Sequence, residues 1–273
     1  QSNWMMNRMM VGRNGQRDPR IYYQYYRQVG LTPGTDGPVD EISLECSLPG
    51  YYQPPHIIAY GLYCYLTEGY WGRDHGNDEG IPPDGFKRTL MGVYPAGGEF
   101  DDGGFASKGA GDGLGGNGIT PVVLSSWMHF MDAEVAASGG SGDVTASTLA
   151  GIENSLNKVD DIAGAPAMAQ ASIDSYLANF AVEWGAASTL DAKLELWAEE
   201  FWTTQRGNGI DAYNSYRRNG YPKNLQPTLE PNPGPFPVSM WYPANYAATN
   251  SNVTQKSDVT GRVFWNTSGP TVD

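Results

Sequence analysis

The chain has 273 residues, of which 40% are hydrophobic and 12% aromatic, which is enough for a packed core and excludes a disordered chain. Seventeen basic residues against thirty acidic ones give a net charge of -13, which argues against nucleic acid and against anionic membrane surfaces as partners. A neutral ligand fits this balance better. No apolar run is long enough to span a bilayer.

Residues 1–30 begin with a methionine-rich stretch that we assign to the core. Asp18-Pro19-Arg20 follows, and the aromatic run Ile21–Tyr26 predicts a strand or a buried extended segment. Residues 49–118 are dense in proline, glycine and acidic side chains, so we predict a long loop-rich insert there. Within this insert, the apolar interval Ile57–Leu66 could be a strand or a helix. The methionines of the opening stretch are Met5, Met6, Met9 and Met10.

Helical periodicity begins at Thr120-Pro121, where a capping residue precedes a proline, and the first helix is predicted to stop at Gly139-Gly140. Two more helices follow, and the third ends before Gly185. Each has apolar residues at the spacing of one helix face. These faces are Leu124, Trp127, Met128, Met131 and Val135; Leu149, Ile152, Leu156 and Val159; and Ile173, Tyr176, Leu177, Phe180 and Trp184.

A fourth helix is predicted over residues 188–206, with Ser188 as its N-cap and Leu190, Leu194, Trp197 and Phe201 on its buried face. Gly207 and Gly209 then allow a turn into a short helix, which continues the apolar coverage with Ile210, Tyr213 and Tyr216 and ends at Gly220-Tyr221-Pro222. Near its end, Arg217-Arg218 are expected to pair with Glu199 or Glu200.

Short links between these helices imply antiparallel neighbours, so we predict a mainly α fold of stacked helical hairpins. The usual repeat consensus is absent, and the hairpins would be degenerate and TPR-like. We divide the single region 1–273 into a loop-rich ligand-binding part at 1–118, helical hairpins at 119–222 and an irregular tail at 223–273. The tail is expected to lie over the helices, with Trp241 and Trp265 as anchors.

Several segments together resemble the C-terminal half of the SusD/RagB-like outer-membrane nutrient-binding lipoproteins. The resemblance rests first on Ala198–Pro222, which contains Glu200, Gly207-Asn208-Gly209 and Tyr216-Arg217-Arg218-Asn219-Gly220-Tyr221-Pro222. Asp18-Pro19-Arg20 looks like the DPR segment of the family. Downstream, Phe236-Pro237, Tyr242–Tyr246, Asn250 and Arg262–Trp265 look like its closing series, whereas Val238-Ser239 stand where members often have arginines.

The resemblance implies a SusD-like fold and a surface-exposed protein of the outer membrane that is not an enzyme. It would bind an oligosaccharide or a peptide and deliver it to a SusC-like TonB-dependent transporter. Family members carry a lipidated cysteine and helical repeats upstream, so we expect a missing N-terminal half as a further partner and the lipid anchor. Cys46 and Cys64 are the only cysteines, and whether they are bridged stays open.

The candidate binding residues lie in the loop-rich insert, where helix periodicity does not account for the aromatic pairs. Sugar rings present apolar C–H faces that stack on aromatic planes, and nearby polar side chains can hydrogen-bond the hydroxyl groups. The alternative is that these rings only pin the loop. The candidates are Tyr51, Tyr52, Tyr70 and Trp71 for stacking, and Asp74, His75 and Asn77 for hydrogen bonds.

No catalytic motif stands out. Gly111–Gly116 satisfies G-x-G-x-x-G, but no predicted strand leads into it, so we read it as a surface loop. We expect no cofactor, although Asp74–Gly80 and Asp101-Asp102 could supply oxygen ligands to Ca²⁺ without following an EF-hand spacing. Two other functions remain open: a secreted carbohydrate-active hydrolase domain, and a structural fragment without a complete site.

Overall fold

The computed structural model describes residues 2–27, 69–70, 72, 75, 89–98, 101, 113–226, 228 and 232–266, to which every structural statement below refers. This part of the chain is mainly helical, as the sequence predicts. None of its helices is long and apolar enough to cross a membrane.

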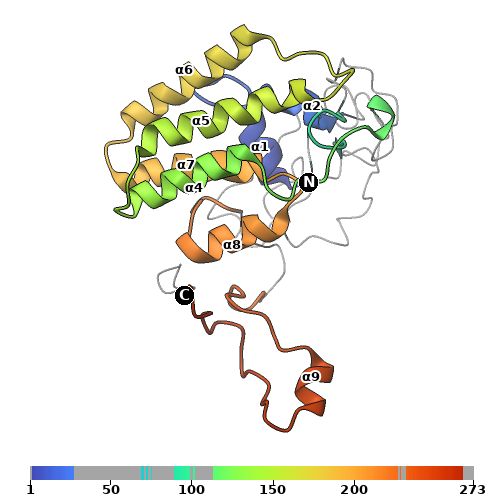
Figure 1. Ribbon diagram of the computed structural model, residues 1–273, viewed down its shortest axis with the longest axis vertical. Helices are drawn as coiled ribbons and strands as arrows, with labels where there is room; N and C mark the ends of the chain where they lie inside the picture. Colours follow the sequence, from blue (N-terminus) through green and yellow to red (C-terminus); the bar gives the residue numbers. More distant parts are fainter. Residues whose placement is uncertain are drawn as a thin grey trace.

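Four helices form the body of the fold (Figure 1). They are α4 (Ser125–Ala137), α5 (Val144–Asn157), α6 (Gln170–Ala186) and α7 (Leu190–Thr204). α4 and α5 pack together most extensively, and α5 also contacts α6 and α7. A 3₁₀ turn, η6 (Lys158–Asp161), extends the end of α5. α4 and α5 are thus packed neighbours, which agrees with the short link between them.

Aromatic side chains fill the core between these helices. The rings of Phe130 and Phe201 stack with centroids 5.2 Å apart, and Trp197 packs against Phe201 while its indole N–H donates to the Phe130 carbonyl oxygen at 3.0 Å. α4 and α5 come close at Gly151, where an added Cβ would lie 2.7 Å from Cε2 of Phe130. Packing of this density makes the helix positions mutually dependent.

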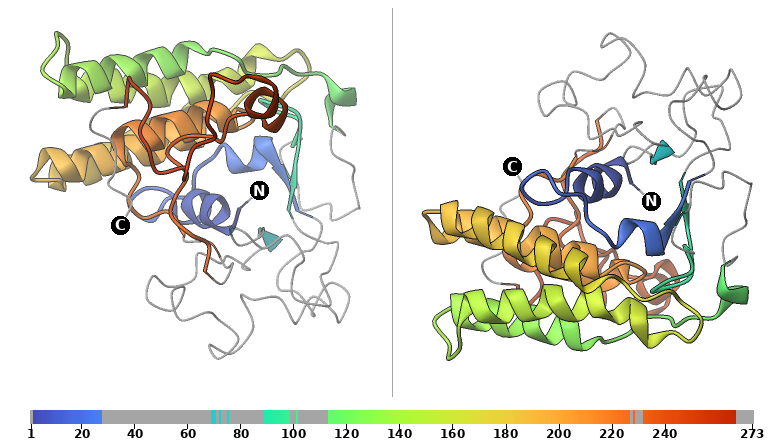
Figure 2. Two further views of the ribbon diagram at one scale, coloured as in Figure 1. Left: turned by 90° about the horizontal axis from the view of Figure 1, so that it is seen from below. Right: turned by 90° about the horizontal axis from the view of Figure 1, so that it is seen from above.

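The N-terminal segment covers the side of α7 opposite to α4 and α5 (Figure 2). It contains α1 (Asn3–Val11), α2 (Ile21–Gln24) and the strand β1 (Tyr25–Tyr26), which pairs antiparallel with β2 (Leu90–Met91). A second core cluster forms here, and three of the four opening methionines are buried in it. Its members are Met6, Met9, Met10, Ile21, Tyr25 and Tyr70, with Met5 packed against them.

The chain leaves the body through α8 (Gly209–Asn219), which begins at the N-cap Asn208 and ends at Gly220 with φ 78°. This left-handed cap confirms the predicted stop. The described part of the tail contacts α8 near both ends of the tail. Between these contacts it extends away from the helices and carries α9 (Ala244–Thr249), as Figure 1 shows. A short 3₁₀ turn, η5 (Leu114–Gly116), precedes α4.

Several boundaries differ from the prediction. Ile21–Gln24 is helical, and only Tyr25–Tyr26 is strand. α4 begins at Ser125 instead of after Thr120-Pro121, because Leu124 is still extended and acts as the N-cap. The N-cap of α7 is Thr189, whose hydroxyl oxygen accepts from the Ala192 amide, and Ser188 precedes it. In each case the helix or strand forms in the expected region of the chain.

Some predicted apolar contacts are also wrong. On the predicted faces, Met128 is 48% exposed and Val135 is 55% exposed, and Ile210 of α8 is 75% exposed. In the tail, Trp241 is 51% exposed and does not act as an anchor, whereas Trp265 lies under the Arg217 guanidinium at 4.5 Å. The helices therefore bury narrower stripes than the sequence pattern indicates.

Candidate functional site

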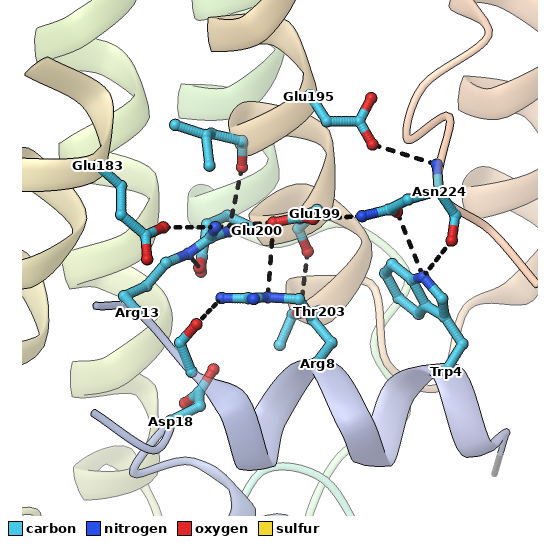
Figure 3. A network of polar contacts seen from close by, with 12 residues as sticks. Trp4, Arg8, Arg13, Asp18, Glu183, Glu195, Glu199, Glu200, Thr203 and Asn224 are labelled. Carbon is cyan, nitrogen blue, oxygen red and sulfur yellow. Dashed lines mark hydrogen bonds and ion pairs between the residues drawn. The ribbon is translucent and has the colours of Figure 1, made fainter. Parts of the chain in front are cut away.

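A buried network of charged side chains joins the N-terminal segment to α7 (Figure 3). Arg13 follows α1, and its Nε donates to Oε1 of Glu200 at 2.7 Å while its Nη1 donates to Oε2 of Glu199 at 2.7 Å. The same Nη1 reaches Glu183 of α6 at 3.2 Å. One arginine thus binds carboxylates from two helices.

Arg20 completes the network from the other side of Glu200. Its Nη2 donates to Oε2 of Glu200 at 2.7 Å, and its Nε donates to Oδ1 of Asp18 at 2.9 Å. The hydroxyl of Tyr176 on α6 donates to Oε1 of Glu200 at 2.8 Å. The Arg20 side chain is 0% exposed and that of Glu200 is 1% exposed, so both charges depend on each other for solvation.

The pKa values of these groups follow from burial and neighbouring charge. Burial alone would raise the pKa of Glu200, but the guanidinium groups of Arg13 and Arg20 outweigh it and lower the pKa to about 2. For Arg13, burial acts to lower the pKa, and the carboxylates of Glu200 and Glu199 raise it above its ordinary value. Both side chains therefore stay charged at neutral pH, and the network acts as a structural clasp.

A pocket of about 350 Å³ lies beside this network, where α1, α7, α8 and the start of the tail meet. Its wall is aromatic and apolar, and it opens to solvent at the exposed residues His75 and Gly209. None of the described lining residues is an aspartate, glutamate, lysine or arginine. The lining residues are Ser2, Trp4, Met5, His75, Trp202, Gly209, Ala212, Tyr213, Tyr216, Leu225, Gln226 and Phe236.

Three edge-to-face ring contacts build this wall. Trp4 and Trp202 have centroids 5.8 Å apart at 73°, Trp202 and Tyr216 6.0 Å apart at 77°, and Tyr216 and Phe236 5.1 Å apart at 79°. Trp4 is held in turn by its indole N–H, which donates to the Asn224 carbonyl oxygen at 3.1 Å. The rings come from four separate segments and hold one another in place.

Of the predicted binding residues, the structure brings His75 into the pocket. Tyr70 is 0% exposed in the second core cluster, and its hydroxyl donates to Oδ2 of Asp101 at 2.8 Å, so its ring packs in the interior. Burial raises the pKa of the Tyr70 hydroxyl. The other predicted binding residues lie outside the described part of the chain, as do Cys46 and Cys64. These binding residues are Tyr51, Tyr52, Trp71, Asp74 and Asn77.

The described residues contain no cluster of metal-ligating side chains. Asp101, one of the candidate calcium ligands, forms an ion pair with Arg27 and accepts the Tyr70 hydroxyl. Its neighbour Asp102 and nearly all of Asp74–Gly80 lie outside the described residues. The carboxylate of Asp101 is thus already committed to protein donors.

The predicted pairing of Arg217-Arg218 with Glu199 or Glu200 is wrong. Arg218 pairs with Glu134 of α4, with Nη2 and Oε2 2.6 Å apart. Arg217 instead donates to the Val238 carbonyl oxygen at 3.1 Å and lies over the rings of Tyr213 and Trp265. The two glutamates are saturated by arginines from the N-terminal segment, which local sequence spacing could not reveal.

Sequence reasoning missed the aromatic wall. Trp202 follows Phe201 directly and therefore lies off the stripe of Leu194, Trp197 and Phe201. The position of Trp202 outside the core stripe is the sequence feature that indicates a second aromatic cluster, because large rings are rarely exposed without a packing partner. Tyr213 and Tyr216 were read only as apolar coverage of α8.

No protein-family model matches the chain, and no curated protein matches its sequence significantly. The family resemblance therefore rests on the quoted motifs.

Proposed function

We propose that the chain is part of a SusD-like nutrient-binding protein at the surface of an outer membrane. It captures a glycan or oligosaccharide and passes it to a SusC-like TonB-dependent transporter, and its helices are degenerate TPR-like hairpins. The family-like segments support this, because they meet in space: Asp18 and Arg20 of the DPR segment contact Tyr176 and Glu200 in the buried network. Residues that carry the resemblance, from the N-terminal segment and from α7, thus belong to the same buried charged network.

The observation that carries the proposal is the aromatic pocket with His75 at its opening. Carbohydrate ligands are uncharged in most cases and offer apolar ring faces that pack on aromatic side chains. A protein of net charge -13, whose described pocket lining contains no aspartate, glutamate, lysine or arginine, suits such a ligand better than an anionic one. His75 belongs to the same loop-rich insert as the predicted stacking residue Trp71.

Binding without turnover is favoured over hydrolysis by the state of the carboxylates. Glycoside hydrolysis needs two carboxyl groups that face the ligand. The described pocket lining offers none, and Glu199 and Glu200 are occupied by Arg13 and Arg20. We therefore propose that the site captures its ligand and releases it unchanged.

A glycan array followed by calorimetry on the best ligand tests the proposal. Trp71→Ala should weaken binding by about 1 to 3 kcal/mol, the scale of a lost aromatic anchor, with little change in melting temperature. Trp241→Ala is a matched control, because Trp241 is half exposed and remote from the insert in sequence. Product analysis after incubation with the same ligands should show no cleavage. Turnover would identify a hydrolase, and silence across the array would leave the structural fragment as the better account.

A further inference from the structure

Three polar groups around the aromatic pocket are engaged with the protein itself. The indole N–H of Trp4 donates to Asn224, the Tyr213 hydroxyl donates to the Pro237 carbonyl oxygen, and the Ser2 hydroxyl oxygen accepts from the Met5 amide. The rest of the described wall consists mainly of ring surfaces and the apolar side chains of Met5, Ala212 and Leu225. It also contains the buried indole N–H of Trp202, which has no hydrogen-bond partner in the described part of the chain.

A pyranose can lay one apolar face on the rings of this pocket, but full burial of the whole sugar ring in the interior costs more than burial of an aryl group. Each hydroxyl group of the sugar would leave water, and most of the described lining is ring surface or apolar side chain, which does not replace the lost hydrogen bonds. A charged group would be worse, since none of the described lining residues is an aspartate, glutamate, lysine or arginine that could pair with it. The interior therefore selects an uncharged, flat and apolar group.

We propose that this pocket binds an aryl group attached to the ligand, as in an aryl glycoside or an aryl ester of a glycan. The wall already arranges its rings edge to face, and Trp202 and Tyr216 would offer a further ring the same geometry. The pocket volume of about 350 Å³ lies at the lower end of the range for small-molecule sites, about 300 to 1,000 Å³. The identity of the sugar portion, which stays in water near His75, rests on the proposed function.

Matched pairs of probes separate the aryl group from the sugar. Phenyl and methyl β-D-glucoside, galactoside and xyloside are titrated into the full chain by calorimetry. Each phenyl glycoside should bind about tenfold more tightly than its methyl counterpart. The reason is that a buried phenyl ring in edge-to-face contact gains more binding free energy than a buried methyl group. The preference should be similar for the three sugars.

A filled pocket provides the control. Ala212→Phe adds a ring at a lining position of α8 and should abolish the preference, whereas Ile210→Phe adds the same ring on the same helix at a residue that is 75% exposed and should leave it intact. Melting curves verify that both variants are folded.

A second measurement needs no variant. In protein labelled with ¹³C at the methionine methyl groups, the phenyl glycosides should shift the Met5 signal, because Met5 lines the pocket. The buried Met6 and Met9 should respond less.

The outcomes distinguish the two proposals. Equal affinity of phenyl and methyl probes, or a Met5 signal that no phenyl probe moves, overturns the aryl site, and glycan binding on the array would still support the proposed function. If phenyl probes shift Met5 but no array glycan binds, the aryl site is supported and the nutrient-binding proposal fails.

Discussion

Arg20 and Glu200 lie 180 residues apart in the sequence, yet Nη2 of Arg20 donates to Oε2 of Glu200 at 2.7 Å where solvent does not reach either side chain. A charged pair of this kind stabilises a fold only while both partners are present, because each is the other's replacement for water. The pair therefore belongs to the clasp that holds the N-terminal segment against α7.

Removing the charge of Glu200 should destabilise the protein strongly. We expect Glu200→Gln to lower the free energy of unfolding by about 3 to 5 kcal/mol, because Arg13 and Arg20 would keep a buried charge without its counter-charge. Urea denaturation measures this. Asp161→Asn serves as the control: its pair with Lys158 is exposed and should contribute less than about 1 kcal/mol. Equal losses of unfolding free energy in the two variants would contradict a stabilising role of the clasp.

The same carboxylate predicts an acid transition. The pKa of Glu200 is lowered from 4.5 to about 2 in the folded state, so the unfolded chain takes up this proton first as the pH falls. The ionised Glu200 carboxylate contributes about 3 kcal/mol to the free energy of unfolding. This contribution is complete above pH 4.5 and is lost as the pH falls towards about 2. Urea midpoints measured between pH 7 and pH 3 should fall less steeply in Glu200→Gln than in the wild type. Parallel curves would count against this assignment.

Trp197 tests the helical core. It is 1% exposed, and Trp197→Ala should cost about 3 to 5 kcal/mol through the cavity left beside Phe201 and Phe130. Trp241→Ala, at a ring that is 51% exposed, should change the stability much less. Thermal melts of both variants suffice, and a Trp197→Ala protein with wild-type stability would show that the register of α7 is wrong.

Alanine substitutions at two helical glycines should change the stability of the protein in opposite directions. Gly151→Ala would push a Cβ to 2.7 Å from Phe130 and should destabilise by about 1 to 3 kcal/mol, despite the better helix propensity of alanine. Gly185→Ala, where a Cβ meets nothing within 4 Å, should stabilise α6 by up to about 1 kcal/mol. Chemical denaturation of the two variants compares them directly. A stabilised Gly151→Ala would place α4 and α5 further apart than described.

The regular helices could be predicted because their apolar periodicity agrees with their packing. Ile173, Tyr176, Phe180 and Trp184 are all buried on α6, as their spacing indicates. The start of α4 was missed, since the Thr120-Pro121 signal is local. The following Val122 and Val123 are β-branched, which disfavours the first helical turn, and both side chains are exposed.

The site was less predictable than the fold. His75 was named from its loop, but the rings around it come from segments whose meeting depends on tertiary packing. Trp4 and Trp202 are close because the clasp draws α1 onto α7, and no periodicity encodes a contact between residues so far apart. The partners of Glu199 and Glu200 were not predictable either, because Arg13 and Arg20 lie more than 170 residues away in the sequence.

The clasp also sets an order of events during synthesis. α1, which carries Met6, Met9 and Met10, leaves the ribosome almost two hundred residues before the carboxylates of α7 and Trp202 that hold it. At translation rates of about 5 to 20 residues per second, this apolar helix waits for roughly ten seconds or more before its docking surface exists. The methionine-rich segment is therefore exposed to misassociation until α7 has been made, and a chaperone that shields short methionine-rich segments would act during this interval.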